Sequence, residues 1–510
     1  MSFPLVRKVG NVERYSLARA NVKIYINVVV GARLHEQPKS GSTPPPRNHA
    51  QWVQLLTGPL TWLIQEHPNL SVVIGDHLSG TPVFLQMPSV DLSRIIRVTS
   101  VDRQVDINAV LEDEHQAHFD TGSTEVPLWR IVVVEVKEDG SFYLCYCYQH
   151  SIGDGRAGLG LVDQLIERLN IQAATDEPQN LPSVVVIPSA VRPMPDNLEA
   201  IVDCAPSLGV LVKGAVMSLL LPAFVKRALE KKYWSGEFDA TLKVPNETQV
   251  VAMYLTKEET AQVVQAAKDR KTTVHVILLA ASAFATKLVF LSNPAGDNHQ
   301  GPTTTKDAMN FTTPCTLRPI IGAPLTPYVQ GNYTSEIASK NVKIKLETGF
   351  WDVAQRFRKQ LVAETSKPKN LYGYIGLLAY LPKEQGGWEK FLCEQVEKEQ
   401  HGREATLQIS NLGVGLKQPA DSPVGFKVLD AMFSQSSSIT AAALTFNAVT
   451  ANGVLLVTST WQKSAFTGRD RGELHMKEFK RILLEATQPD RTNYQFREVF
   501  TVPLATIKSQ

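Results

Sequence analysis

The sequence predicts an α/β protein in which one structural unit occurs twice. Segments with the apolar, β-branched character of strands alternate with segments that show the 3.6-residue period of helices. Hydrophobic residues make up 43% and charged residues 20% of the 510 residues, as in typical soluble proteins. A chain of this length is expected to form about two or three domains. Length and composition therefore exclude global disorder and a small disulfide-stabilised scaffold.

The N-terminal region alternates strands and helices before it reaches the repeated unit. The pattern predicts a strand at 22–30, a helix at 50–66 and a strand at 70–74. The unit itself begins as a β-hairpin, with β-rich runs at 131–136 and 142–148 joined by an Asp-Gly turn. A polar loop then leads into a helix with one apolar and one charged face.

The second copy of the unit lies near the C-terminus. Runs 441–450 and 454–461 predict a hairpin around an Asn-Gly turn, and a helix is expected at about 473–484. When the turn glycines Gly140 and Gly453 are aligned, a glutamine follows nine residues later in both copies. Gln, Ser, Gly and Arg residues then coincide in the two loops. We therefore expect two halves of one ancestral fold.

The loop of the first copy contains residues suited to proton transfer. His150 follows a stiff strand, and an imidazole with an ordinary pKa of about 6.5 is the side chain best suited to accept a proton near neutral pH. The second copy has Lys463 at this position, so reactive residues are expected in the first half only. Gly153 and Gly155 permit a tight path from strand to helix. Asp154 could orient the imidazole or turn away from it to fasten the loop.

A proline-rich stretch at 176–197 predicts an extended linker, and we place the main boundary there. The chain is divided into an N-terminal subdomain at 1–200, a helical crossover segment at 201–246 and a C-terminal subdomain at 247–510. The longest apolar region, 208–229, lies in the crossover segment and contains a lysine and a proline. A buried or crossover helix is favoured over a helix on a lipid surface. A membrane-spanning helix is disfavoured, because its charge would be buried.

Charge and cysteine content narrow the partners and the compartment. The 52 Lys and Arg residues against 50 Asp and Glu residues leave a net charge of +2, so nucleic acid is not an expected partner. Five scattered cysteines indicate a reducing compartment, and the charged N-terminus disfavours a signal peptide. Cys145 and Cys147 share one strand face without a histidine at zinc spacing, so buried thiols are favoured over a metal site. We expect a cytoplasmic, metal-free protein, peripheral to membranes only if the apolar region binds lipid.

The loop also contains a literal G-x-G-x-x-G motif, from Gly153 to Gly158. In dinucleotide-binding proteins this motif brings a pyrophosphate to a helix N-terminus. Here the preceding strand belongs to a hairpin, and Asp154 would bring negative charge toward the diphosphate. A nicotinamide-dependent oxidoreductase or a flavin enzyme stays as a minor alternative. The chain contains no G-x-S-x-G, Walker A or H-E-x-x-H motif.

The H-x-x-x-D-G motif formed by His150, Asp154 and Gly155 resembles the active-site motif of the chloramphenicol acetyltransferase-like superfamily. This superfamily includes plant-type acyltransferases and condensation domains, and within it the chain is most similar to fungal alcohol O-acetyltransferases. The likeness extends over most of the chain, through segments in the expected order: Gly10-Asn-Val-Glu13-Arg14-Tyr15, Asn27-Val-Val-Val-Gly31-Ala32-Arg33, His67-Pro68-Asn69-Leu70, Thr316-Leu-Arg318-Pro319, Gly331-Asn332-Tyr333 and Ser410-Asn411-Leu412-Gly413. The ordered set is much more specific than the motif alone.

The resemblance implies two similar chloramphenicol acetyltransferase-like subdomains that meet at a solvent tunnel. His150 would act as the general base that deprotonates an acceptor hydroxyl during its attack on the thioester of an acyl-CoA, without a covalent acyl-enzyme. Asp154 would be structural, with its carboxylate turned from the tunnel and paired with an arginine. Arg318 is our candidate for that partner.

The resemblance also places Ser410 and Asn411 where polar groups face the histidine and could stabilise an oxyanion. An ordinary turn before Gly413 is the alternative interpretation of these two residues. The chain lacks the D-F-G-W-G segment of plant-type relatives and has the polar run 433–438 in its place. Ser434 and Ser436 of this run are further candidates for lining the substrate site, and the CoA contacts stay unassigned.

Together these features predict an acyl-CoA-dependent O-acyltransferase, with acetyl-CoA as the expected co-substrate and no permanently bound cofactor. The acceptor would be a small or medium alcohol or a fungal secondary metabolite, and a monomer is expected. The alternative is a condensation-like module that uses a carrier-bound thioester or binds a metabolite without acyl-CoA turnover.

Overall fold

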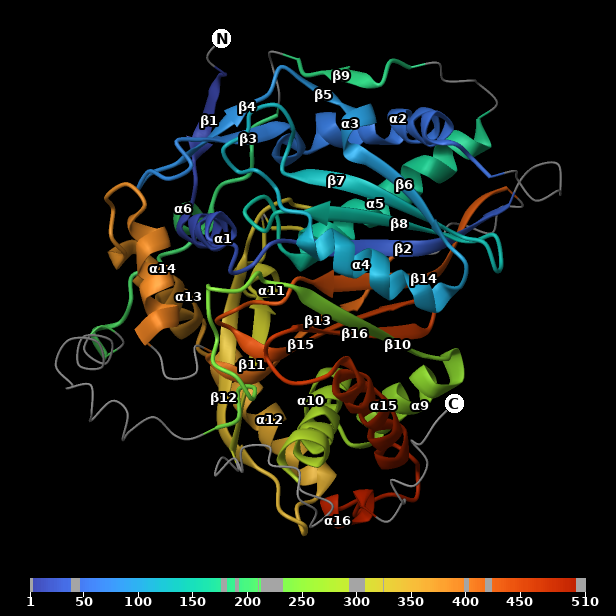
Figure 1. The fold of residues 1–510 in the computed structure, drawn as a ribbon, viewed down its shortest axis with the longest axis vertical. Helices are drawn as coiled ribbons and strands as arrows, with labels where there is room; N and C mark the ends of the chain where they lie inside the picture. Colours follow the sequence, from blue (N-terminus) through green and yellow to red (C-terminus); the bar gives the residue numbers. More distant parts are fainter. Residues whose placement is uncertain are drawn as a thin grey trace.

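The computed structural model describes residues 3–37, 46–175, 181–188, 192–209, 211, 233–292, 308–323, 325–398, 403–417 and 424–500. Two large mixed sheets lie one above the other in Figure 1, each with helices packed on it. In spatial order, the five-stranded sheet contains β14 (Gly425–Gln435), β2 (Val28–Gln37), β8 (Phe142–Tyr148), β7 (Trp129–Val136) and β6 (Ile96–Val101). The six-stranded sheet contains β10 (Thr248–Leu255), β16 (Val454–Gln462), β15 (Ala442–Ala451), β13 (Ala405–Val414), β11 (Ala308–Thr316) and β12 (Thr334–Lys343).

The helices and minor strands fill the space around these sheets. The helices of the first half are α1 (Asn11–Asn21), α2 (His49–Glu66), α3 (Leu92–Ile95), α4 (Ile107–Gln116), α5 (Gly155–Ala174) and α6 (Leu198–Ile201). Those of the second half are α9 (Lys257–Asp269), α10 (Val274–Thr286), α11 (Arg318–Ile321), α12 (Phe350–Thr365), α13 (Pro368–Gly376), α14 (Gly387–Lys398), α15 (Arg469–Ala486) and α16 (Phe496–Val499). Two small sheets contain β1 (Leu5–Lys8), β4 (Val83–Gln86) and β3 (Val72–Gly75), and β5 (Ser89–Asp91) with β9 (Val184–Val186).

The two large sheets share one topology, which confirms the predicted duplication. The run β2-β8-β7-β6 pairs antiparallel, antiparallel and parallel, and the run β10-β16-β15-β13 pairs in the same way. Each hairpin is followed by a long helix, α5 in the first half and α15 in the second. The predicted α/β class and both repeated units are therefore present.

Strand β14 links the two halves. It comes from the C-terminal region, but it pairs antiparallel with β2 of the N-terminal sheet, from Gly425 opposite Gln37 to Gln435 opposite Val28. It also packs against β15 and β16 of the other sheet. The sequence division at 1–200, 201–246 and 247–510 stays a prediction, and it does not describe this exchange. The expected apolar helix at 208–229 falls largely outside the described residues.

The strand predicted at 22–30 is shifted in the structure. Strand β2 begins at Val28 and continues to Gln37. The polar residues at its end are ordered as a strand because β14, nearly 400 positions away in the chain, supplies the hydrogen-bonding partner. By contrast, helix α2 starts within one residue of the predicted position.

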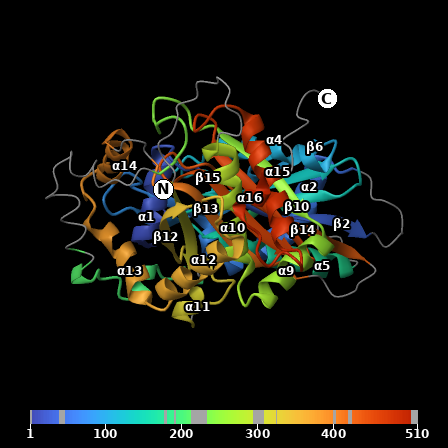
Figure 2. The same cartoon turned by 90° about the horizontal axis from the view of Figure 1, so that it is seen from below.

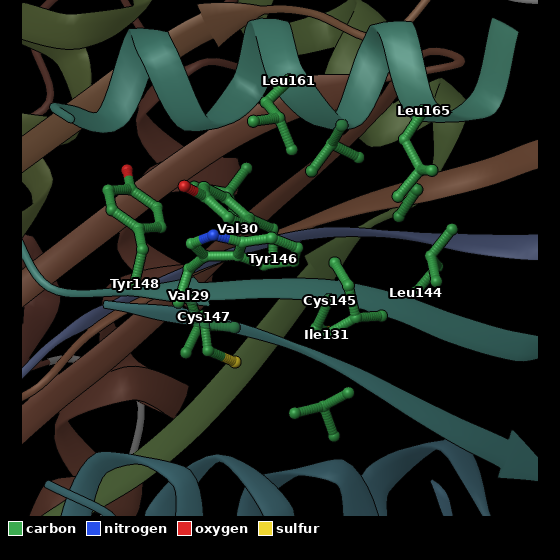
Figure 3. Close-up of a cluster of buried hydrophobic side chains, with 14 of the residues drawn as sticks. Val29, Val30, Ile131, Leu144, Cys145, Tyr146, Cys147, Tyr148, Leu161 and Leu165 are labelled. Carbon is green, nitrogen blue, oxygen red and sulfur yellow. The ribbon is translucent and has the colours of Figure 1, made fainter. Parts of the chain in front are cut away.

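The core of the first half lies between the N-terminal sheet and its helices. All seven residues of β8 are buried, and Leu161 and Leu165 of α5 lie over the sheet in Figure 3. The rings of Tyr146 and Tyr148 stack with centroids 4.5 Å apart on the same strand. Burying one large apolar side chain contributes roughly 1.5–3 kcal/mol. Packing of this kind makes β8 a rigid support for the loop that follows it.

A second apolar helix forms the core of the other half. Among the described residues, Val274–Leu291 is the one helical segment that is long and apolar enough to cross a membrane. However, 72% of that segment is buried inside the protein. It packs against α12 and α15 on the C-terminal sheet, at the bottom of Figure 1 and near the centre of Figure 2. The segment is therefore a core helix of this fold.

Candidate active site

The loop between β8 and α5 is held by its own polar side chains. The Gln149 side chain accepts a hydrogen bond from the backbone N–H of Ser151 at 2.5 Å and donates one to the carbonyl of Ser16 at 3.0 Å. Further along, the amide of Asn69 donates to the carbonyl of Ile152 at 3.0 Å. These bonds fix the backbone on both sides of His150.

Asp154 is fully buried and connects the two halves of the molecule. Its Oδ1 atom accepts a hydrogen bond from the backbone N–H of Ala157 at 2.9 Å, so it caps α5. Its Oδ2 atom accepts from the backbone N–H of Tyr333 at 2.9 Å and from Nη1 of Arg318. Its own N–H donates to the carbonyl of Gly331 at 3.0 Å. The carboxylate thus has three protein donors, two of them from the C-terminal half.

The capping bond explains where α5 begins. The apolar periodicity of the sequence indicates a helix from Gly158 onward, but the helix starts at Gly155, directly after its cap. Gly155 lies so close to β13 that an added Cβ atom would be 2.6 Å from Cδ2 of Leu412. At Gly153 the nearest atom to such a Cβ would be 3.4 Å away, at Ala157. The close approach of α5 to β13 therefore requires a glycine at 155 and not at 153.

His150 is held from the opposite half by Asn332. The Nδ2 atom of Asn332 lies 3.0 Å from Nδ1 of His150 and 3.1 Å from the His150 carbonyl oxygen. Thr334 donates its hydroxyl to Oδ1 of Asn332 at 2.8 Å, which fixes the orientation of that amide. Among the described residues, no protein group hydrogen-bonds to Nε2 of His150. The other ring nitrogen is therefore available to a substrate.

The surroundings of His150 favour the neutral imidazole. Burial, and then the positive charge of Arg19, lower the pKa of His150 to about 4. The Arg19 guanidinium lies between two aromatic rings, 4.5 Å from the Tyr15 ring and 4.6 Å from the Tyr25 ring. A ring that is neutral at physiological pH can accept a proton.

The tautomer of this neutral ring depends on Asn332. If Nδ1 carries the proton, it can donate to the His150 carbonyl, and Nε2 has a free lone pair. If Nδ1 accepts from Asn332, the proton sits on Nε2 instead. Only the first arrangement leaves a base facing outward.

Ser410 and Asn411 lie on β13, in register with β15. The Asn411 side chain accepts a hydrogen bond from the backbone N–H of Gly413 at 2.7 Å, and Gly413 has a φ of 73°. This local bond matches the alternative interpretation of Asn411 as a turn residue. Ser410 is buried, and neither residue hydrogen-bonds to His150 among the described residues.

Ser434 and Ser436 are committed to bonds within the protein. Ser434 Oγ lies 2.7 Å from Nε2 of His115, and Ser436 Oγ accepts from the backbone N–H groups of Ile26 and Asn27 at 2.9 and 3.2 Å. Burial and the charge of Arg130 lower the pKa of His115 to about 3. The polar run 433–438 therefore ties β14 to the N-terminal half, and its two serines do not contact His150 in the described residues.

Sequence reasoning singled out neither Arg19 nor Asn332 as a site residue. Asn332 was visible only as part of the Gly-Asn-Tyr segment, and Arg19 had no signal at all, because its place beside His150 depends on the packing of α1. Cys145 and Cys147 are buried free thiols, as expected. The described residues contain no cluster of His, Cys, Asp or Glu suited to hold a metal ion.

Comparisons with known proteins concern the family and the fold of the chain. Residues 101–483 match the alcohol acetyltransferase family. The chain is 20% identical over 485 residues to a probable alcohol acetyltransferase of Aspergillus fumigatus, crmB. This match covers 89% of this chain and 94% of that protein.

Among solved structures, the trichothecene 15-O-acetyltransferase TRI3 of Fusarium sporotrichioides has a TM-score of 0.63 at 12% identity and covers 94% of this chain and 95% of its own. The first condensation domain of the calcium-dependent antibiotic synthetase has a TM-score of 0.58 at 12% identity. The match covers 97% of this chain and 98% of that domain. At such identities the likeness concerns the fold, and it confirms the pseudo-duplicated, chloramphenicol acetyltransferase-like architecture. With the family match covering most of its length, the chain belongs to the alcohol acetyltransferase family.

Proposed function

We propose that the protein is an acyl-CoA-dependent O-acyltransferase that transfers an acyl group to the hydroxyl of a small or medium alcohol. The expected acyl group is acetyl. The observation that carries the proposal is the neutral His150 ring, whose Nε2 atom has no protein partner among the described residues and keeps its lone pair when the Nδ1 proton is directed to the His150 carbonyl. Membership of the alcohol acetyltransferase family supports transfer to an alcohol.

In the proposed reaction His150 is the general base. Its Nε2 atom removes the proton of the acceptor hydroxyl as the oxygen attacks the thioester carbonyl of acyl-CoA. The tetrahedral intermediate then collapses, the C–S bond breaks, and the imidazolium returns the proton to the departing thiolate. The products are an ester and free CoA, and no covalent acyl-enzyme forms.

Asp154 and Arg318 would act as positioning residues in this mechanism. Their buried pair connects the base loop to the C-terminal half, and no hydrogen bond joins Asp154 to the His150 ring among the described residues. Ser410 stays the proposed oxyanion donor, since the hydroxyls of Ser434 and Ser436 already have protein partners.

The test is incubation with acetyl-CoA and a panel of alcohols, with free thiol and ester both measured. His150→Ala should lower kcat/KM by roughly 10²- to 10⁴-fold, because general base catalysis contributes about that factor. His35→Ala, at an exposed histidine of β2, is the matched control and should change little. Activity of His150→Ala within a few fold of the wild type, with normal thermal unfolding, would refute the assigned role.

A second candidate function is a condensation-like module that accepts a carrier-bound thioester. The fold similarity to a condensation domain favours keeping it. Thiol release that occurs with an acylated carrier protein, and not with acetyl-CoA, would support this candidate and overturn the first.

A further inference from the structure

Arg19 lies in the last turn of α1, close to the proposed base. The Tyr25 ring contacts both groups: its centroid is 4.6 Å from Cζ of Arg19 and 5.9 Å from the centroid of the His150 ring. The Tyr25 hydroxyl donates to Oε1 of Gln435 at 2.8 Å, so this ring is held in place. One fixed aromatic ring therefore contacts both the guanidinium and the imidazole.

Arg19 differs from the fully buried arginines in lacking an oxygen acceptor. Arg14, Arg130 and Arg318 each hold a carboxylate. Arg403 donates to two carbonyls and one side-chain amide. No described residue hydrogen-bonds or ion-pairs with the Arg19 side chain, and its Nε is buried without a partner. A partly buried guanidinium without an anion is unfavourable, so this charge is available to a ligand.

Two ionisable side chains lie within electrostatic reach of Arg19, namely His150 and Glu336 of β12. Arg19 and His150 are partly exposed and Glu336 of β12 is exposed, although burial shifts the pKa of His150 downward and that of Glu336 upward. The positive charge of Arg19 contributes to lowering the pKa of His150, and at Glu336 it opposes the larger upward shift caused by burial. Gln408 already donates to Glu336 at 2.9 Å, and no ion pair joins Glu336 to Arg19 in the described residues.

We propose that Arg19 binds a carboxylate of the acceptor, so that the preferred acceptors are hydroxy acids. A guanidinium can donate two parallel hydrogen bonds to a carboxylate, and stacking on Tyr15 and Tyr25 leaves its edge free for this. The hydroxyl of the same acceptor would reach Nε2 of His150, which lies beside the same Tyr25 ring. This inference rests on the proposed function, because it names the acceptor class of that site.

Binding of a carboxylate would also strengthen the base. The anion would offset the charge of Arg19 that disfavours protonation of His150. The pKa of His150 should therefore be higher in the acceptor complex than in the free enzyme. This rise in pKa would place the acid limb of the kcat profile, which reports the complex, at a higher pH than the acid limb of the kcat/KM profile, which reports the free enzyme. The difference should occur with acidic acceptors only.

The experiment compares 3-hydroxybutyrate with its methyl ester, which has the same hydroxyl without the charge. The wild type should prefer the acid in kcat/KM by about tenfold or more, the effect expected of a charged hydrogen bond. Arg19→Gln should bring the acid-to-ester ratio close to one, and Arg19→Lys should keep part of the preference. Arg168→Gln is the matched control, because Arg168 also stacks on an aromatic ring, Trp62, but lies far along α5 from His150.

Two results would overturn the inference. One is a wild-type enzyme that does not prefer the acid. The other is an Arg19→Gln variant that loses the same factor with both acceptors, which would point to oxyanion stabilisation instead. A protein that transfers acetyl to neither acceptor in a His150-dependent manner contradicts the proposed function itself. Carboxylate binding measured by calorimetry on the wild type and Arg19→Gln then tests the Arg19 contact without turnover.

Discussion

The two hairpin–loop–helix units have the same backbone plan and different chemistry. In the first unit, His150 is partly exposed and Asp154 is fully buried with three protein donors. At the position equivalent to His150, the second unit has the exposed Lys463, which forms an ion pair with Glu247 at 2.7 Å. At the position equivalent to Asp154 it has Thr467, whose backbone N–H donates a hydrogen bond to Glu237 at 3.0 Å. Helix α15 also begins without a side-chain cap. The hairpin–loop–helix backbone alone therefore does not form the candidate active site. The site also depends on contacts between the loop and the opposite half of the molecule.

Removing the charge of Asp154 should have the largest effect on stability. Asp154→Asn keeps the shape but leaves Arg318 buried without a counter-charge, which costs about 3–5 kcal/mol. Chemical denaturation should show this loss together with low acyltransfer. Thr467→Val at the equivalent position of the second unit is the control and should stay within about 0.5 kcal/mol of the wild type. Equal losses in the two variants would contradict the distinction between the units.

A methyl group at Gly155 tests the close approach of α5 to β13. Gly155→Ala should destabilise the protein by about 1–3 kcal/mol, because Leu412 or the helix must move. Gly153→Ala has room for its methyl group and should be nearly neutral. Thermal unfolding of the pair measures the difference, and a Gly153→Ala variant as unstable as Gly155→Ala would show that the loop itself, rather than the helix contact, is sensitive.

The pH dependence of the reaction tests the surroundings of His150. Since the folded pKa is lowered to about 4, the neutral form should persist through pH 5, and kcat/KM should fall only as the pH approaches 4. The unfolded chain binds the proton more readily, so His150 also reduces stability as the pH falls below about 6.5.

Asn332→Asp should raise the acid limb by about one unit or more, because a carboxylate beside Nδ1 stabilises the imidazolium. The kcat/KM profile between pH 4 and 8 checks this shift. Asn332→Ala supplies no such charge and should not reproduce it. An unchanged limb in Asn332→Asp would mean that Asn332 does not face the ring in solution.

The smallest effect is expected at Lys463. Its pair with Glu247 is largely exposed and screened by solvent, so Lys463→Ala should leave the stability close to that of the wild type. Urea unfolding at low and high salt measures it. A loss as large as that of Asp154→Asn would mean that the second loop carries more of the fold than its contacts indicate.

The sequence predicted the features that depend on local pattern. Both hairpins, both following helices and helix α2 were legible from periodicity and turn residues, and the H-x-x-x-D-G motif pointed to His150 and Asp154. The features it did not predict depend on residues distant in the chain. The end of β2 forms a strand because it pairs with β14, and Asn332 lies beside Nδ1 of His150. The hydroxyl of Ser434 hydrogen-bonds to His115. A single sequence contains no pattern for such partners.

The exchanged strand β14 also restricts how this protein can change. A fragment that ends before β14 would expose the hydrogen-bonding edge of β2, and this edge could then pair with a strand of another molecule. Swapping complete halves between relatives would force the incoming β14 to match a foreign β2 and a foreign α4. New substrate preferences are therefore more accessible by point substitution around Arg19 and His150 than by recombination of the two halves.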